Sequence, residues 1–279
     1  MGDVGAVSQE LADYAAHDGP PVDALEASFA CSAEARMAFL AGDVEAAERL
    51  ARQALRVPEG FEGLARSLTM SVMWWIWWQK GELALPDHEF RDTIAQSAAP
   101  FTNRWAAWAL IHAEAQETDD AVGWLRKLLD IGWPDVGGYL TEGLPLAWAA
   151  AACSAVGAAA HEPAAHVYES LRPFAGTAVV TRAPAMGCAG PADQYLGLLA
   201  RLSGDQALAE VHFEASLRLA RRMGAAPFVA AAELELARTL RRRRPEEEAD
   251  RIARLLRHAE ESALAMGLRR LAQLAAEPG

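Results

Sequence analysis

Histidines beside a carboxylate are the first residues in this sequence that could do chemistry. His161 and His166 enclose Glu162, which is close to the H-E-x-x-H pattern whose two histidines bind zinc from one helix face. Here the histidines are five residues apart instead of four, so the second imidazole lies about 140° around a helix from the first. Pro163 also marks a helix start. We therefore expect no metal site at this motif.

Two further clusters place acidic residues where they could act on a ligand. His88 and Asp92 have the i, i+4 spacing that two metal ligands could use, but no third ligand is identifiable. Residues 117–120 read ETDD, and an acid there could protonate a substrate held against aromatic walls, as in a terpene cyclase. The alternative is that Thr118 or Asp119 caps a helix whose first turn holds the remaining acids, where the helix dipole favours them. We adopt this second interpretation.

The usual signatures of nucleophilic catalysis are missing from the sequence. It contains no G-x-S-x-G elbow and no signal for a paired cysteine and histidine. Cys31, Cys153 and Cys188 are odd in number and far apart, which favours reduced thiols in a cytoplasmic protein over a disulfide framework. The first residues show no signal-peptide pattern. We expect a cytoplasmic protein with no metal and no cofactor, and we favour a role without catalysis while leaving an enzymatic role open.

Tryptophan is the residue whose distribution most needs an explanation. All nine tryptophans lie between positions 74 and 148. The run WWIWW at 74–78 places four rings within an arc of roughly 160° on a helix that turns 100° per residue. Trp105, Trp108 and His112 follow at i, i+3 and i+7, so they share one face of another helix.

Two interpretations of these rings stay open. They could be core side chains that fill space between helices, or some could line a concave pocket for an aromatic, polycyclic or cationic ligand. For the second interpretation we place the site on the surface bounded by helices 61–80 and 102–116, with the histidine as the polar group that orients the ligand. The candidate binding residues are Trp74, Trp75, Trp78, Trp105, Trp108 and His112.

Helices must position the candidate binding residues. The amphipathic spacing of apolar residues and the helix-breaking glycines and prolines predict helices along the whole chain. The breaks fall at glycine and proline, for example at Pro58 to Gly60, Pro86, Pro100 and Pro245. Segment 173–190 is the one long stretch with little helical character, and no segment alternates strongly enough for a confident strand. The predicted helices are 7–17, 23–41, 43–57, 61–80, 87–98, 102–116, 118–131, 141–157, 162–172, 191–203, 205–223, 226–243, 245–266 and 268–276.

An internal repeat indicates how these helices are arranged. Residues 37–55, MAFLAGDVEAAERLARQAL, return at 199–217 as LARLSGDQALAEVHFEASL. Each copy contains the end of one helix, a Gly-Asp turn and a second helix with alanine where helices approach closely. Repeated helix pairs are the signature of an α-solenoid. We therefore predict an all-α fold, a tetratricopeptide-like α-solenoid of antiparallel helix pairs that forms one right-handed superhelix.

The second half of the chain carries a more specific pattern. Its matching features include Tyr168, Gly190-Pro191, Leu196-Gly197, His212-Phe213 and Met223-Gly224-Ala225. With these features the segment resembles the tetratricopeptide-like C-terminal sensor region of bacterial ATPase-containing LuxR-type regulators and of related ATPase-linked cyclases. The resemblance covers roughly residues 145–270, and it implies a helical-repeat sensor or interaction module.

Despite the resemblance, we expect neither ATP hydrolysis nor DNA binding, because the sequence has no G-x-x-x-x-G-K-[ST] loop and no helix-turn-helix after Leu271. We predict one helical-repeat domain over 1–279, with a Trp-rich half at 1–144 and a regulator-like half at 145–279. The net charge is −12, the opposite sign from a nucleic-acid or membrane-surface binder. The eight arginines between 238 and 257 are interpreted as helix-end charges.

The function that these observations favour is a stand-alone, non-catalytic binding module. Its partner would be a protein, a peptide or a small hydrophobic or aromatic effector on a concave Trp-rich face. The alternative is a cofactor-free, cyclase-like enzyme of secondary metabolism, or a protein that sequesters a drug for self-resistance. An enzyme would fold its substrate in the aromatic cage and use an acid or His112 as a proton shuttle.

Overall fold

A computed structural model describes residues 24–56, 62–83, 85, 89–96, 101–130, 143–180 and 188–277 of the chain. The helix predicted at 7–17 lies outside the described residues, and so do His88 and Trp133. All six predicted binding residues lie within the described ranges.

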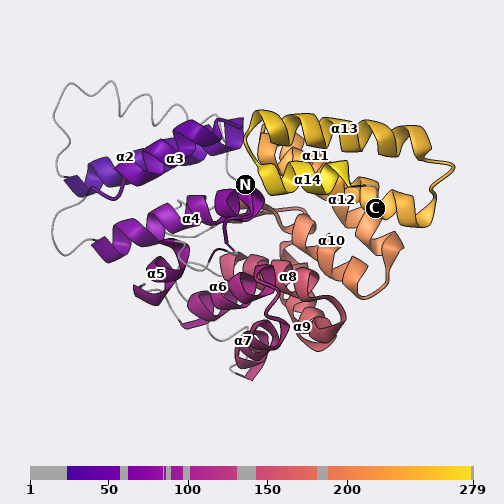
Figure 1. Ribbon diagram of the computed structural model, residues 1–279, viewed down its shortest axis with the longest axis horizontal. Coiled ribbons are helices and arrows are strands. Elements are labelled where there is room, and N and C mark those ends of the chain that lie inside the picture. Colours follow the sequence, from indigo (N-terminus) through magenta and orange to yellow (C-terminus); the bar gives the residue numbers. More distant parts are fainter. Residues whose placement is uncertain are drawn as a thin grey trace.

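Helices form nearly all of the described structure (Figure 1), which confirms the all-α class. The α-helices are α2 (Ala24–Ala41), α3 (Val44–Gln53), α4 (Glu62–Lys80), α5 (Glu89–Gln96), α6 (Phe101–Glu114), α7 (Thr118–Asp130), α8 (Gly143–Val156), α9 (His161–Leu171), α10 (Ala192–Leu202), α11 (Gln206–Arg222), α12 (Ala226–Arg243), α13 (Ala249–Ala265) and α14 (Arg269–Ala276). Two short 3-10 segments, Gly157–Ala160 and Arg172–Phe174, flank α9.

The predicted helix boundaries agree with the observed ones to within four residues. One of the larger differences is at α13, which begins at Ala249 instead of position 245. Pro245 and the three glutamates after it form turns, and the backbone N–H of Glu248 donates to the carbonyl oxygen of Arg244 at 3.1 Å. The proline therefore separates the two helices without starting the second one.

Segment 173–190 contains two short strands that the sequence did not reveal. β1 (Ala178–Val180) and β2 (Cys188–Pro191) pair antiparallel, with a register shift between Val179 and Val180. A Cβ atom on Gly143 would lie 2.6 Å from the Val179 side chain, so the first residue of α8 must be small for β1 to pack there. The strand pair covers the start of α8.

The repeat predicted at 37–55 and 199–217 is one turn that occurs twice in the structure. Gly42 and Gly204 have φ angles of 90° and 89°, in the left-handed region that glycine adopts without strain. Asp43 and Asp205 follow them and cap α3 and α11, each carboxylate accepting a backbone N–H three residues ahead at 2.9 Å. The sequence repeat therefore corresponds to a repeated pair of helices joined by a capped turn.

Small residues allow the paired helices to approach closely. Ala47 and Ala209, equivalent in the two copies, are both fully buried. On α10, a Cβ atom at Gly197 would lie 2.6 Å from the ring of Phe213 on α11. The Leu-Gly and His-Phe pairs of the second half are therefore parts of one helix–helix contact.

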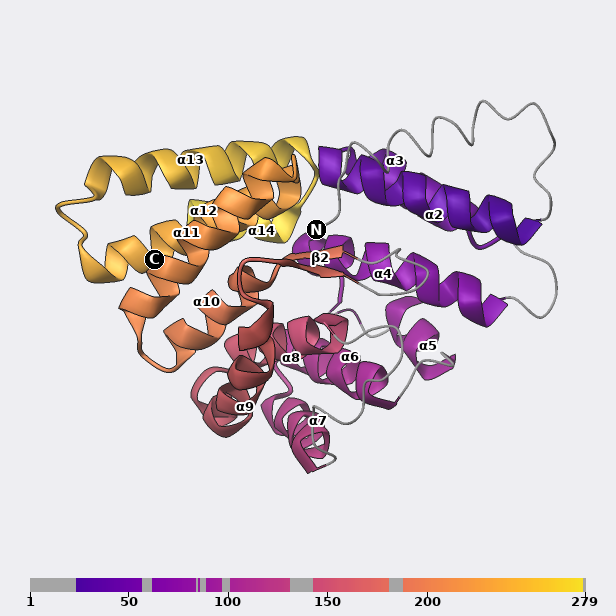
Figure 2. The ribbon, with the colours of Figure 1, turned by 180° about the vertical axis from the view of Figure 1, so that it is seen from behind.

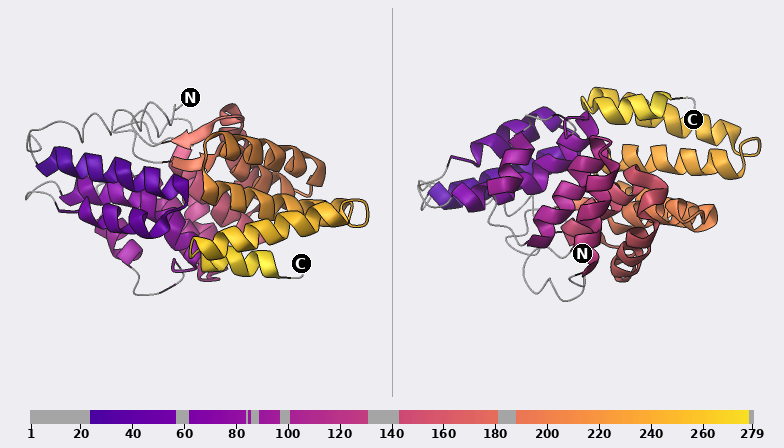
Figure 3. Two further views of the ribbon diagram at one scale, coloured as in Figure 1. Left: turned by 90° about the horizontal axis from the view of Figure 1, so that it is seen from above. Right: turned by 60° about the horizontal axis from the view of Figure 1, so that its bottom comes forward.

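Helices from the two ends of the described chain also touch each other (Figures 1, 2 and 3). A Cβ atom at Gly42 would meet the sulfur of Met266 at 3.2 Å and the Cβ of Ala226 at 3.3 Å. Next to this contact, the Arg269 guanidinium of α14 donates to Glu82, which follows α4, at 3.1 Å. The N-terminal and C-terminal helices therefore meet end to end, at the turn after α2 and the turn after α13.

Helix α8 lies in the middle of the protein and is buried almost all round, with buried residues from Gly143 to Cys153. The helical stretch Gly143–Phe174 is the one stretch in the described ranges that is long and apolar enough to cross a membrane, and 67% of its apolar window is buried inside the protein. Such burial is typical of a core helix. The buried hydrophobic residues form one cluster that extends from Ala35 to Ala275.

Burial of Cys153 makes an alkaline stability change predictable. Burial raises the pKa of this thiol from 9.0 to about 12, so the unfolded chain loses the proton first as the pH rises above 9. The folded state therefore loses stability between pH 9 and 12, by about 1.4 kcal/mol between pH 8 and pH 10 for this one group. In Cys153→Ala, the alkaline loss measured by urea unfolding should shrink by that amount.

The matched control is Ser154→Ala, which changes the next residue and removes no thiol. Burial also raises the pKa of Cys188 and of Tyr195, so some alkaline loss should persist in both variants. An unchanged loss in Cys153→Ala would contradict the assignment.

Candidate ligand-binding cavity

A cavity of about 190 Å³ lies at the centre of the protein, where α4, α6, α8, α10, α12 and α14 converge. We call it the inner cavity. A larger cavity of about 690 Å³ adjoins it between α8, α9, α10 and α12, and we call this the outer cavity. The two share Ser154, Leu198, Arg201 and Arg238. The two cavities therefore lie next to each other, the smaller one inside and the larger one outside.

The outer cavity carries positive charge in an acidic protein. Its lining contains Arg201, Arg238, Arg241 and Arg242 and no carboxylate, whereas the chain as a whole has a net charge of −12. The arginines come from one face of α12 and from the end of α10. Guanidinium groups recognise carboxylate and phosphate with paired hydrogen bonds. The outer cavity is therefore suited to an anionic group.

Glu235 balances part of this charge where the two cavities meet. Its carboxylate pairs with the guanidinium of Arg201 and lies 3.7 Å from that of Arg238. Burial alone would raise the pKa of Glu235, but the two arginines together hold it below its ordinary value. Glu235 is therefore a carboxylate at neutral pH and fixes both guanidinium groups at the cavity wall.

Glu114 holds one side of the inner cavity together. Its carboxylate accepts the indole N–H of Trp78 at 2.8 Å and the Arg270 guanidinium through both oxygens at 3.0 Å. The same guanidinium lies over the Trp78 ring, 5.2 Å from its centroid, a favourable cation–π arrangement. These three side chains come from α4, α6 and α14, so the contact joins helices from the two ends of the chain.

Gln79 is a polar side chain of the inner cavity that has an atom without a hydrogen-bond partner. It is 3% exposed, and its Oε1 atom has no hydrogen-bond partner in the part of the chain that the structure describes. The other amide of this cavity, Gln194, accepts the hydroxyl of Ser216 at 3.0 Å. Buried polar atoms in folded proteins are nearly always paired, so the free oxygen of Gln79 needs an explanation.

The structure places two of the six predicted binding residues, Trp75 and Trp78, at the inner cavity. Both are also well packed, since Trp75 contacts Phe39 and Phe228 with ring centroids 5.5 and 4.9 Å away. Trp74 is 0% exposed and belongs to the core, where it stacks on Trp78 at 5.9 Å. The four neighbouring rings of α4 thus divide between the cavity wall and the core.

Trp105, Trp108 and His112 do not line the inner cavity and lie apart from it on α6. His112 is two residues before Glu114, and two residues correspond to 200° around a helix. Because Glu114 faces the cavity, His112 faces away from it. The ring of His112 lies 5.8 Å from that of Trp108, and Trp105 and Trp108 are partly buried against the hydrophobic core.

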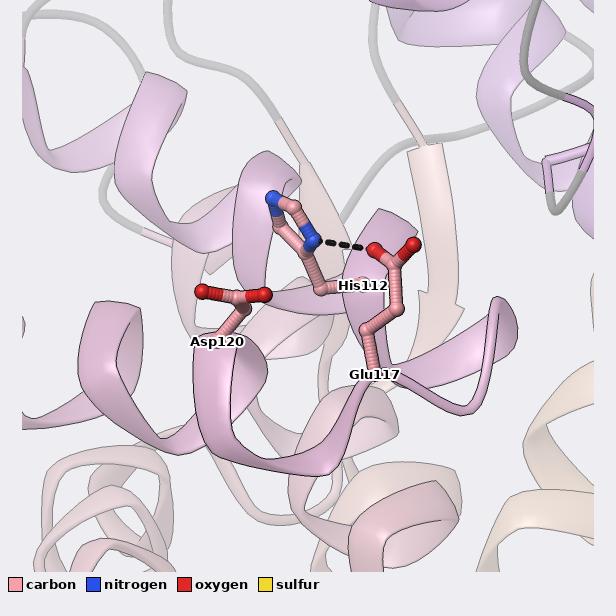
Figure 4. Close-up of side chains that lie close together, drawn as sticks. All are labelled: His112, Glu117 and Asp120. Atoms are coloured by element: carbon pink, nitrogen blue, oxygen red, sulfur yellow. Dashed lines mark hydrogen bonds and ion pairs between the residues drawn. The ribbon is translucent and has the colours of Figure 1, made fainter.

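His112 is instead close to the acidic start of α7 (Figure 4). Its Nδ1 lies 2.6 Å from Glu117, and one ligand atom each from His112, Glu117 and Asp120 lie within 4.8 Å of one another. These three atoms could coordinate a divalent cation, but both carboxylates are exposed. Thr118 begins α7 and both aspartates lie in its first turn, which is the arrangement expected from the helix dipole.

A second polar network lies away from the central cavity, between α9, α10 and α11. Asp193 bonds the Nδ1 of His212 at 2.8 Å, and the Nε2 of His212 bonds the hydroxyl of Tyr168 at 3.0 Å. Burial raises the pKa of Tyr168, so this hydroxyl keeps its proton at neutral pH. Asp193 also accepts the backbone N–H of Gly176 at 2.6 Å. The network joins three helices to the turn before β1.

Sequence reasoning missed the charged part of the cavity. The arginine run was interpreted as helix-end charge, and this holds for Arg241, Arg242 and Arg243, which lie in the last turn of α12. Arg238 and Arg242 belong to the same run but line the outer cavity. A signal was present in their spacing of four residues, which puts both on one face of α12.

Comparisons with family models, with curated proteins and with solved structures found no match to this chain. Its function is therefore inferred from the geometry of the cavity.

The position of Trp74 leads to a stability prediction. Replacing this fully buried ring with alanine leaves a cavity in the core, so Trp74→Ala should lower the free energy of unfolding by about 3–5 kcal/mol. Trp124 is the control, because it is only partly buried and has Lys127 over its ring at 3.9 Å. Trp124→Ala should lower the free energy of unfolding by clearly less than Trp74→Ala does. Equal losses in urea unfolding would show that Trp74 is not a core residue.

The contact between Glu114 and Arg270 should be measurable by a double-mutant cycle. Glu114→Ala and Arg270→Ala each leave a partly buried charge without its partner, so their losses of stability should not add. We expect a coupling energy of about 1–3 kcal/mol from urea unfolding.

The neighbouring pair of Arg269 and Glu82 serves as the reference for this cycle, because the Arg269 side chain is 70% exposed. Its coupling should stay below about 1 kcal/mol. Equal coupling in the two cycles would mean that Glu114 does not fasten α14 to the rest of the protein.

Proposed function

We propose that this chain is a non-catalytic binding module that holds a small anionic effector in its central cavity. The observation that carries the proposal is the outer cavity, whose lining has four arginines and no carboxylate. Its volume of about 690 Å³ lies within the range of small-molecule sites, about 300–1,000 Å³. An acidic protein that gathers arginines in one concave place creates a local attraction for anions.

The scaffold that we infer for this module is a tetratricopeptide-like, right-handed superhelix of antiparallel helix pairs. The repeated turn at Gly42 and Gly204, with its aspartate cap, supports this inference. We also propose kinship with the sensor region of ATPase-containing LuxR-type regulators, on the residues that resemble it. The three free cysteines are compatible with the cytoplasmic location that we propose.

A small effector fits the cavity better than a protein or a peptide. The inner cavity is lined by side chains from six helices, and Trp75 and Trp78 are buried, so these rings offer little surface to a folded partner. A peptide could reach the outer cavity alone. Aromatic walls at one end and arginines at the other instead match a compact ligand with an apolar part and an anionic group.

A fluorescent aromatic anion, 8-anilinonaphthalene-1-sulfonate, provides a direct test. We expect it to bind with one-to-one stoichiometry at the central cavity. Ser154 lines both cavities and is half-buried, so Ser154→Trp should place a large ring where the two cavities adjoin and weaken binding at least tenfold, which is ~1.4 kcal/mol. The control Ala253→Trp adds the same ring at an exposed position of α13 and should leave binding within twofold.

Charge is tested with a second matched pair of variants. Arg242→Glu reverses a charge at the outer cavity, and Arg254→Glu makes the same change at an exposed site on α13. We expect Arg242→Glu alone to weaken binding of the probe severalfold. The proposal fails if the probe does not bind, or if binding is the same in all four variants.

A further inference from the structure

The outer cavity holds more positive charge than the described carboxylates around it neutralise. Arg201 and Arg238 share one carboxylate, that of Glu235, which lines the inner cavity instead of the outer one. Arg238 also lies 3.6 Å from Glu277, but that side chain is 61% exposed, so water weakens its effect. Arg242 makes no ion pair with any described residue. A surplus of positive charge therefore remains at the outer cavity.

The groups that could bind an anion reach this cavity from three helices. Arg238, Arg241 and Arg242 have i, i+3 and i+4 spacing, so they share one face of α12. Arg201 comes from the last turn of α10, and His161 begins α9. All five side chains line the same concave space. A tetrahedral phosphate has oxygens that point in several directions and suits such donors better than a planar carboxylate, whose two oxygens lie in one plane.

The rest of the lining is mostly apolar. Ala158, Leu198 and Leu202 supply aliphatic surface beside the guanidinium groups. The volume of about 690 Å³ lies within the range of sites that hold whole small molecules, about 300–1,000 Å³. The cavity therefore has room for an organic group next to the anion, and its leucines favour an apolar one.

We propose that the ligand of the outer cavity is a phosphate monoester with a compact apolar part. The phosphate lies among Arg201, Arg238 and Arg242, and the organic group lies on Leu198 and Leu202. A phosphate monoester carries close to two negative charges at neutral pH, so it gains more from a positive cavity than an ion with a single charge does. This inference rests on the function proposed above and specifies the ligand class for the same site.

Three probes separate charge from apolar contact in calorimetric titrations at pH 8. Phenyl phosphate carries two negative charges at this pH, because its second ionisation lies near pH 6. Phenyl sulfate has nearly the same shape and a single charge, and inorganic phosphate has the charge without the ring. We expect the wild-type protein to bind phenyl phosphate about tenfold or more tightly than either of the other two, a difference of ~1.4 kcal/mol.

The variant Arg242→Gln tests the origin of the preference for phosphate over sulfate. Loss of one positive charge should weaken binding of the ion with two charges more than binding of the ion with one, so the preference should fall by about threefold or more. The control Arg254→Gln makes the same change at an exposed position of α13 and should keep the preference. Thermal melting followed by circular dichroism checks that both variants fold like the wild type.

A second pair of variants tests the location of the phosphate without removing an arginine. Ala158 is an exposed residue of the lining. Ala158→Glu adds a carboxylate there, and Ala158→Gln adds a neutral side chain of nearly the same size. We expect phenyl phosphate to bind Ala158→Glu about tenfold more weakly than Ala158→Gln, because like charges repel. Equal binding to the two variants would place the phosphate elsewhere and overturn the inference.

The outcomes distinguish this inference from the proposed function. If phenyl phosphate binds no more tightly than phenyl sulfate, or if the preference is unchanged in Arg242→Gln, the ligand class is wrong. The proposed function then still stands if the naphthalene sulfonate responds to Arg242→Glu. If inorganic phosphate binds as tightly as phenyl phosphate, the apolar part of the inference is wrong. If neither the phenyl esters nor the naphthalene sulfonate binds, both proposals are overturned.

Discussion

The carboxylate of Glu114 is the interaction on which the shape of the central cavity depends. It accepts hydrogen bonds from Trp78 on α4 and from Arg270 on α14, so a single buried anion joins three helices. A buried charge is costly unless every lone pair is used, and here both oxygens have partners. The position of α14, and with it one wall of the inner cavity, follows from this requirement.

The aromatic and charged parts of the site serve different purposes. The rings of α4 supply buried area to the core and one rigid wall to the cavity. Arg201 of α10 and Arg238 of α12 are kept at the wall by Glu235, which leaves these two side chains ordered before any ligand arrives. Order of this kind reduces the entropy lost on binding. The site therefore combines a packed side with a charged side, and neither requires a catalytic group.

The sequence predicted the helices far better than the site. Glycine and proline set the breaks, and the Gly-Asp turn repeated with the same φ angle and the same cap. The sequence could not predict that Trp74 faces the core and Trp75 the cavity, because this depends on which helices pack on each side of α4. His112 was placed at the ligand because it shares a face with Trp108, but Glu114, two residues on, is the residue that faces the cavity. Gln79 gave no sequence signal, since a glutamine beside four rings is ordinary until its surroundings are known.

The contact of Gly42 with Met266 and Ala226 has a consequence for how this protein unfolds. In an open array of helix pairs the outermost pairs have one neighbour each, so they fray first, and natural arrays end in dedicated polar caps. Here the turn after α2 packs against the turn after α13 and the start of α12, and α4 packs against α14, so the two ends of the described chain support each other. Fraying at one end would uncover the other, so the two ends should be lost together. Contact between the two ends thereby favours the all-or-none cooperativity of an ordinary globular domain.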